Sequence, residues 1–243
     1  MATIHNEGMG GLIGQLVMYN LNGKQIARTR PGLSQSRRKQ LAKSSQAIVF
    51  GRVSRYGTAL MQVLKDHLLF SFTHASYNAV RGWLRNQYAP NLTEPEWPVC
   101  SRFNTTCQLN PLADLRHFLK AGIEISDAGN GQIRITMEAF NPVQQILPPA
   151  GTGAVKLKWI VLSSSFGEGA NEIHSAMQEY SFPYTNAVLP EKQTQLRIGG
   201  SVGDIVLVVM AMEFEMKQAG VGAYAKDIAC MPAAIMAIGK RKE

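Results

Sequence analysis

The chain has 243 residues, of which 45% are hydrophobic and 17% are charged, and its formal net charge is +8. These values exclude a disordered or low-complexity protein and provide enough apolar material for one large domain or two modest ones. The N-terminus lacks the basic and apolar regions of a secretory signal, and the longest apolar run, 205–212, is far shorter than the roughly 20 residues of a transmembrane helix. We therefore expect no signal peptide, no membrane span, and a cytoplasmic or virion location.

Positive charge is concentrated near the N-terminus. Between Gly8 and Lys65 the chain has ten Lys or Arg residues and no Asp or Glu, whereas the remainder has 15 basic and 17 acidic residues. Such a segment attracts nucleic acid, an anionic membrane surface or an acidic protein surface. The alternative interpretation is a basic helix face that contacts only solvent and binds no partner. The candidate residues for contact with a partner or with phosphate are Lys24, Arg28, Arg30, Arg37, Arg38, Lys39, Lys43, Arg52 and Arg55.

The first predicted element is a β-hairpin. Two strands, Leu12–Tyr19 and Lys24–Arg30, flank an Asn-Gly pair at positions 22 and 23, which is a strong signal for a two-residue turn. Because side chains alternate along a strand, the cations at 24, 28 and 30 share one face of the second strand. The sequence therefore predicts a glycine-rich basic hairpin arm over residues 1–32.

Two amphipathic helices are predicted over residues 33–90. Ser34 or Ser36 can cap a helix that continues to about Leu69, and apolar spacing predicts a second helix from about Thr73 to Tyr88. The first helix begins with three cations at 37–39, which oppose the helix macrodipole and so favour a role in binding a partner. The proline-containing segment 91–120 is predicted to be a linker.

The second half changes to a period of two, with short runs separated by turns, which is typical of strands. We therefore predict an α+β fold: the hairpin and two helices, followed by an antiparallel β-sandwich of about seven strands over residues 121–243. The predicted strands are Ile123–Ser126, Gln132–Met137, Val155–Ser163, Ala176–Phe182, Thr194–Ile198, Asp204–Met216 and Ala233–Ile238.

Motifs for catalysis or metal binding are absent from the sequence. The five histidines form no H-E-x-x-H motif, no nucleophile elbow or P-loop is present, and the three cysteines form no C-x-x-C pair. The carboxylate pairs Glu94/Glu96 and Glu213/Glu215 are interpreted as solvated turn or edge positions rather than a glycosidase pair. We therefore expect a non-enzymatic protein without a metal or cofactor.

A family resemblance is carried mainly by the first 40 residues. Its features are Gly11-x-x-Gly14, Tyr19, Asn22-Gly23-Lys24, Arg28-Thr29-Arg30-Pro31 and a polar stretch, Ser34 to Gln40, before a long helix. This pattern resembles an uncharacterised bacterial domain-of-unknown-function family that opens with a glycine-spaced hairpin and continues into a β-rich half. Because that family has no assigned activity, the resemblance implies a two-part organisation and transfers no functional residues.

Two functions fit these observations. The first is a structural or assembly subunit of a virion, tail, filament or particle, in which the basic arm docks on a neighbouring copy or on another protein. The second is a sequence-independent nucleic-acid-binding protein that contacts phosphates through residues 24–55. Binding surfaces for nucleic acid usually combine exposed aromatic residues with cations, and Tyr19 is the one aromatic residue before the first helix, which favours assembly.

Overall fold

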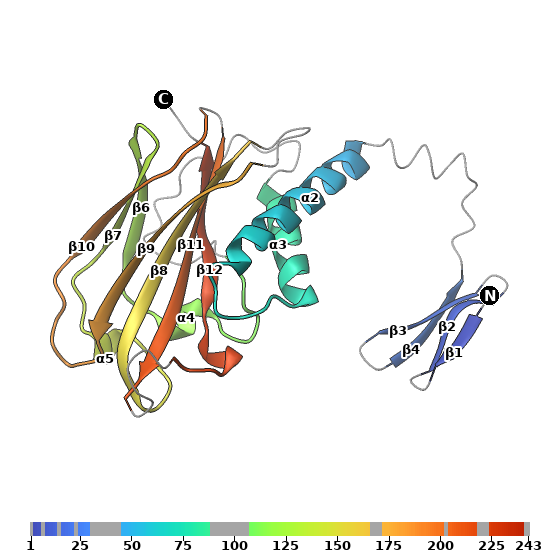
Figure 1. Cartoon of the computed structure of the whole chain (residues 1–243), viewed down its shortest axis with the longest axis horizontal. Helices are drawn as coiled ribbons and strands as arrows, with labels where there is room; N and C mark the ends of the chain where they lie inside the picture. The colour runs from blue at the N-terminus through green and yellow to red at the C-terminus, as the bar shows by residue number, and fades with distance from the viewer. Residues whose placement is uncertain are drawn as a thin grey trace. The chain divides into compact units, whose positions relative to one another are not determined.

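The computed structural model describes residues 2–5, 8–13, 16–21, 24–29, 45–87, 107–165, 172–201, 204–217 and 224–240. The chain forms two compact units, residues 1–48 and residues 49–243. The α+β class, the N-terminal hairpin and the β-rich antiparallel second half are confirmed (Figure 1). The second unit contains residues 49–90 of the predicted helical segment together with the β-rich half.

The first unit contains one antiparallel sheet with its strands in sequential order. Its strands are β1 (Ala2–His5), β2 (Gly8–Ile13), β3 (Leu16–Leu21) and β4 (Lys24–Thr29). The pair Leu21–Lys24 closes the predicted hairpin around the Asn-Gly positions. The prediction of one continuous strand over Leu12–Tyr19 is wrong, because Ile13 pairs with Leu16 and the chain direction reverses between them.

Two helices precede the β-rich half of the chain. Helix α2 spans Ser45–Lys65 and helix α3 spans His74–Gln87. Helix α2 ends four residues earlier than predicted, and its predicted start at Arg37 lies outside the described residues. The Thr73 hydroxyl accepts a hydrogen bond from the Ser76 amide at 3.2 Å, which caps α3. Of the helices that the structure describes, none is long and apolar enough to cross a bilayer.

The remainder of the second unit contains two antiparallel sheets. A five-stranded sheet has the order β5-β12-β11-β8-β9, and a three-stranded sheet has the order β10-β7-β6. The strands are β5 (Cys107–Gln108), β6 (Ile123–Gly129), β7 (Gln132–Met137), β8 (Thr152–Ser164), β9 (His174–Pro183), β10 (Lys192–Arg197), β11 (Ile205–Met216) and β12 (Ala233–Lys240). Strand β5 lies in the predicted linker and was not predicted, whereas β6 to β12 overlap the seven ranges predicted as strands.

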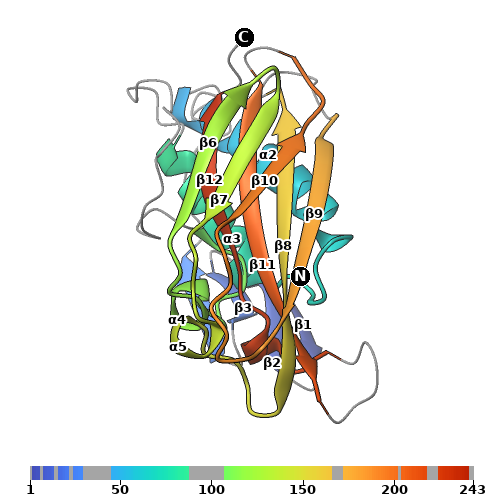
Figure 2. The same cartoon turned by 90° about the vertical axis from the view of Figure 1, so that its left-hand side faces the viewer.

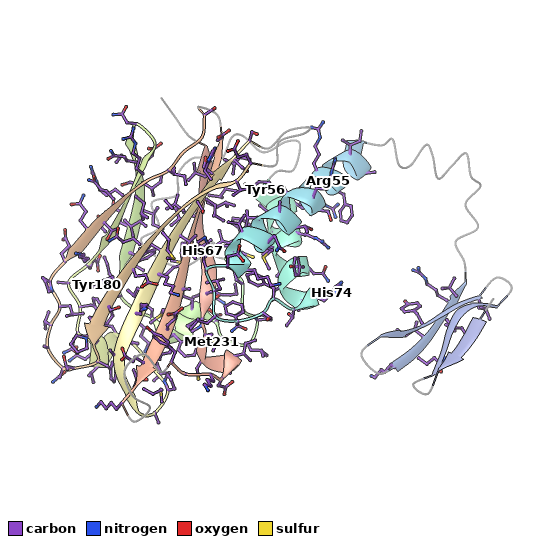
Figure 3. All side chains as sticks on the ribbon, viewed as in Figure 1. Arg55, Tyr56, His67, His74, Tyr180 and Met231 are labelled. Carbon is purple, nitrogen blue, oxygen red and sulfur yellow. The ribbon has the colours of Figure 1, made fainter. Side chains whose placement is uncertain are left out.

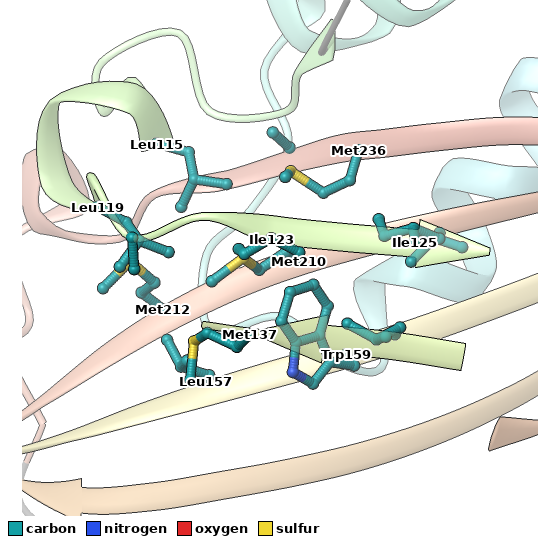
Figure 4. Packing of buried hydrophobic residues seen from close by; sticks show 14 of the residues in the cluster. Leu115, Leu119, Ile123, Ile125, Met137, Leu157, Trp159, Met210, Met212 and Met236 are labelled. Carbon is teal, nitrogen blue, oxygen red and sulfur yellow. The ribbon is translucent and has the colours of Figure 1, made fainter. Parts of the chain in front are cut away.

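Alternation along β8 sends side chains to two separate hydrophobic cores. Leu157 and Trp159 face the three-stranded sheet, whereas Ile160 and Leu162 face α2 and α3. The helices therefore cover one face of the five-stranded sheet and the smaller sheet covers the other (Figure 2). Trp159, which is 2% exposed, packs among methionine and aliphatic side chains from both sheets (Figure 4).

The described part of the predicted linker, residues 107–120, belongs to the packed body. It contains β5 and the one-turn helix α4 (Leu115–Phe118), and its buried residues include Leu109, Leu115 and Leu119. These apolar side chains are spaced by four or six residues. This spacing follows neither the helical nor the strand period, so the sequence pattern alone resembles that of a loop. Two further short helices complete the unit: α5 (Pro142–Gln145) and the 3₁₀ turn η1 (Ile228–Cys230).

Two glycines in α2 provide a matched test of how the helical layer packs. A Cβ at Gly57 would lie 3.3 Å from Arg81 Cγ and 3.4 Å from Leu84 Cδ1, whereas a Cβ at Gly51 would meet nothing within 4 Å. We expect Gly57→Gln to lower the free energy of unfolding by about 1–3 kcal/mol through overpacking against α3. Gly51→Gln should raise it by about 0.5–1 kcal/mol through helix propensity. Urea denaturation checks both values, and equal effects would contradict this account of the helix contact.

Candidate interaction surface

The structure describes four of the nine candidate contact residues. Lys24 and Arg28 lie on β4 with exposed side chains, whereas Arg52 and Arg55 lie near the start of α2. Arg55 is exposed (Figure 3), and its Nε donates to the Gly51 carbonyl at 3.4 Å. Arg52 is half-buried. The other five candidates are outside the described residues: Arg30, Arg37, Arg38, Lys39 and Lys43.

The described face of the N-terminal hairpin combines cations with apolar side chains. Residues 24, 26 and 28 share one face of β4, and their cross-strand partners include Tyr19, opposite Ile26, and Val17, opposite Arg28. The Arg28 guanidinium lies 5.6 Å from the centroid of the Tyr19 ring, within the range of a cation–π contact. This face can therefore contact an apolar surface that also carries negative charge.

None of the nine described side chains of this sheet, residues 16–19 and 24–28, is buried. Leu16 is 42% exposed, and Val17, Met18, Tyr19 and Ile26 are only half-buried. The apolar side chains described on this sheet are therefore at least partly accessible to solvent.

The first turns of α2 also leave apolar side chains exposed. Phe50 precedes Val53 by three residues and so lies on the same stripe of the helix, yet Phe50 is 56% exposed and Val53 is 1% exposed. Ile48, which is 45% exposed, lies on another face of the same turns. The apolar stripe of α2 therefore continues beyond the part that the body covers.

The described cysteines and histidines do not form a reactive site. No group of three potential metal ligands occurs within the described ranges. Burial raises the pKa of the Cys107 thiol to about 12 and, with the Asp227 charge, also raises the pKa of Cys230, so neither thiol is activated as a nucleophile. His67 follows α2 and His74 begins α3, so the two histidines do not share one helix (Figure 3).

One polar cluster at an end of the five-stranded sheet was not predicted from the sequence. Ser163 lies opposite His174 across β8 and β9, and Asp204 accepts a hydrogen bond from the Ser201 amide at 2.8 Å. Ser163 is fully buried, with a hydroxyl that has no partner among the described atoms. Since Ser163 is not accessible and Asp204 is engaged by the loop amide, this arrangement does not form a serine–histidine–aspartate relay.

Helix α2 is held against the same end of the sheet through Tyr56. Burial is the main reason that the pKa of Tyr56 is raised to about 12, and the Asp204 carboxylate also raises it, whereas the Ser164 side chain acts in the opposite direction. The phenol is therefore neutral at physiological pH. Its position ties the helical layer to the ends of β8 and β11.

Glu213 lies in a buried ion-pair ladder, and its predicted solvated position is wrong. It is 5% exposed, and its carboxylate lies 2.5 Å from the Lys158 ammonium, which is itself 8% exposed. Glu179 on β9 continues the ladder, with oxygens 3.6 Å from Lys158 and 3.2 Å from Lys156. The sequence contained one indication of this ion-pair ladder: oppositely charged residues recur at alternate positions of two apolar strands.

The buried pair Lys158–Glu213 gives a stability prediction. Glu213→Gln leaves Lys158 with only the more exposed Glu179, and we expect the free energy of unfolding to fall by about 3 kcal/mol. Lys158→Met/Glu213→Leu removes both charges, and its free energy of unfolding should lie within about 1 kcal/mol of that of the wild type, because Lys156 still neutralises Glu179. The control Glu179→Gln changes a more exposed carboxylate and should lower the free energy of unfolding by at most about 1 kcal/mol. A double variant that is less stable than Glu213→Gln in urea denaturation would disprove the account.

Comparisons with models of known protein families, with curated proteins and with solved structures found no match for this chain. The resemblance to a bacterial family of unknown function therefore stays a prediction from the N-terminal pattern. Three features of the molecule bear on its function. None of the described side chains of the N-terminal sheet is buried, the apolar stripe of α2 is exposed at Phe50, and the second unit has two hydrophobic cores of its own.

Proposed function

We propose that the protein is a non-enzymatic structural or assembly subunit of a larger particle, such as a virion, tail or filament, and that its N-terminal sheet is a docking element. The observation that carries this proposal is the contrast between the two units. The second unit has two buried cores, whereas the described side chains of the first unit include none that is buried. A docking element with this composition gains stability when a neighbouring subunit covers it.

The chemistry of the docking element supports an acidic, partly apolar partner surface. Tyr19, Val17 and Ile26 supply apolar area on the face that Lys24 and Arg28 share. Strand β4 is also an edge strand of this sheet, and strand addition at a sheet edge is a common mode of recognition between proteins. Lys24 and Arg28 on that edge disfavour pairing with a second basic strand and favour an acidic one.

The body supports the role of a platform within an assembly. The two sheets and their common core support the interpretation of a β-sandwich, and the helices on its outer face end in an uncovered apolar stripe at Phe50. Contiguous exposed apolar side chains on such a stripe are typical of protein contacts. A homo-oligomer, located in the cytoplasm or in a virion, is the assembly that we favour.

Tyr19→Ser/Ile26→Ser tests the docking element in the full-length chain. We expect the wild-type protein to form higher-order species at micromolar concentrations and the double variant to lose them, because the variant removes apolar area from the docking face. Mass photometry and sedimentation velocity over a wide concentration range measure both proteins.

The matched control is Leu112→Ser/Val188→Ser, which removes exposed apolar side chains from the body instead, where both residues are more than 60% exposed. The control should assemble like the wild type. A wild-type chain that is monomeric at every concentration would exclude self-assembly, and equal assembly of the wild type and the docking variant would exclude the N-terminal sheet as its cause.

A second candidate function is binding of nucleic acid without sequence preference. The Arg28–Tyr19 contact favours it, because a cation beside an aromatic ring is the combination that binds phosphates and stacks on bases. If the basic segment neutralises about five to eight phosphates, the logarithm of affinity for duplex DNA should fall with the logarithm of salt concentration with a slope of roughly −4 to −7.

Lys24→Ala/Arg28→Ala distinguishes this candidate from assembly. The variant should make the salt slope shallower by about 1–2 in filter binding, because each lost phosphate contact changes the slope by about one. The control Lys192→Ala/Arg197→Ala removes two exposed cations from β10 and should keep the wild-type slope. No binding at low salt, or a slope that the first variant does not change, would disprove nucleic-acid binding through β4.

A further inference from the structure

Strand β9 forms a long, regular edge of the five-stranded sheet. Its ten residues pair with β8 in one unbroken register, from Ser163–His174 to Ala154–Pro183. On its other side, no described strand pairs with it (Figure 2). Within the part of the chain that the structure describes, no strand uses the backbone donors and acceptors along that side, which leaves them available to another strand.

The other edges of the two body sheets carry features that disfavour further pairing. At the opposite edge of the same sheet, β5 has two residues, pairs with Ala234 and Ile235 of β12, and lies beside α3. In the smaller sheet, β6 is interrupted by a bulge between Asp127 and Gly129, and β10 has Lys192 and Arg197 at its two ends. Short strands, bulges and edge cations are the usual protections against edge-to-edge pairing.

Strand β9 lacks these protections. It has no bulge, and its one proline, Pro183, is the last residue of the strand. Its one carboxylate, Glu179, is neutralised by Lys156 at 3.2 Å and Lys158 at 3.6 Å, so it does not act as a repelling edge charge. The outward side chains beside it are small or apolar: Ser175, Met177 and Ser181 are exposed, and Met177 is 44% exposed.

We infer that the β9 edge is an interface at which two copies of this chain pair β9 against β9 in antiparallel orientation. A second copy fits better than a basic strand such as β4, because Glu179 is already paired and offers no free negative charge to Lys24 or Arg28. A symmetric pair brings two neutral edges together without like-charge repulsion, and a twofold dimer is the commonest assembly of identical subunits.

Such pairing joins the two five-stranded sheets into one continuous sheet. The twofold axis of an antiparallel strand pair is perpendicular to the sheet, so both copies place α2 and α3 on the same face. This interface is separate from the docking element of the proposed function, although the inference rests on that function because both require self-association.

Ser175→Lys/Met177→Lys tests the interface in the full-length chain. The two substitutions place cations on the exposed face of β9, and they should weaken dimerisation at least tenfold by repulsion between the paired edges. Gln193→Lys/Gln195→Lys adds the same charge at exposed positions of β10, an edge that is already protected, and should dimerise like the wild type. Sedimentation velocity gives the dissociation constants, and circular dichroism verifies that both variants fold.

Hydrogen exchange on the wild type provides a second measurement that does not depend on a variant. Amides of 174–183 should exchange more slowly at high than at low protein concentration, because dimerisation adds hydrogen bonds along β9. Unchanged exchange, or a β9 variant that dimerises like the wild type, would overturn the interface. If Tyr19→Ser/Ile26→Ser abolishes all association while exchange in β9 stays constant, the assembly function stands and the β9 interface fails. A chain that is monomeric at every concentration overturns both.

Discussion

The pairing of β8 with β11 is the interaction on which the rest of the structure depends. These two strands are the longest of those that the structure describes, they pair along nearly their whole lengths, and their side chains are buried on both faces of the sheet. A strand that is buried on both faces must be apolar at consecutive positions, which is the pattern of Ile205–Met212. Both cores share this pair, so the helical layer and the smaller sheet are each stable only while the β8–β11 pair is formed.

This central position also explains why a buried ion pair is tolerated beyond the apolar run. Removing Lys158 and Glu213 from water costs several kcal/mol, and only close mutual contact together with Glu179 offsets the cost. The same ladder has a consequence at the edge of the sheet, because Lys158, which contacts the buried Glu213 carboxylate, also lies 3.6 Å from Glu179, the one carboxylate of β9. The buried ion pair and the charge of the sheet edge are thus coupled through Lys158.

Much of the fold follows from local patterns in the sequence. The Asn-Gly turn, the period of α3 and the apolar run of β11 each depend on neighbouring residues alone, and each prediction agrees with the structure. The wrong or missing predictions depend on contacts between residues that are distant in the sequence. Glu213 is buried because strands β8 and β9 supply its cations, and β5 exists because β12 pairs with it. The candidate cations Lys24 and Arg28 belong to the proposed interaction surface, whereas the exposed stripe at Phe50 and the unprotected edge of β9 could not be predicted without knowing which neighbours cover them.

The two proposed contacts differ in the physics that selects their partners. The N-terminal face combines cations with half-buried apolar side chains, so its affinity should fall as salt screens the charges. The β9 edge is neutral and depends on backbone hydrogen bonds and apolar contact, which salt affects little. A subunit with one salt-sensitive and one salt-insensitive contact can form a stable dimer first and join dimers into larger species as conditions allow. That order of assembly follows from the charges of the two surfaces alone, since only the basic one requires a partner of opposite sign.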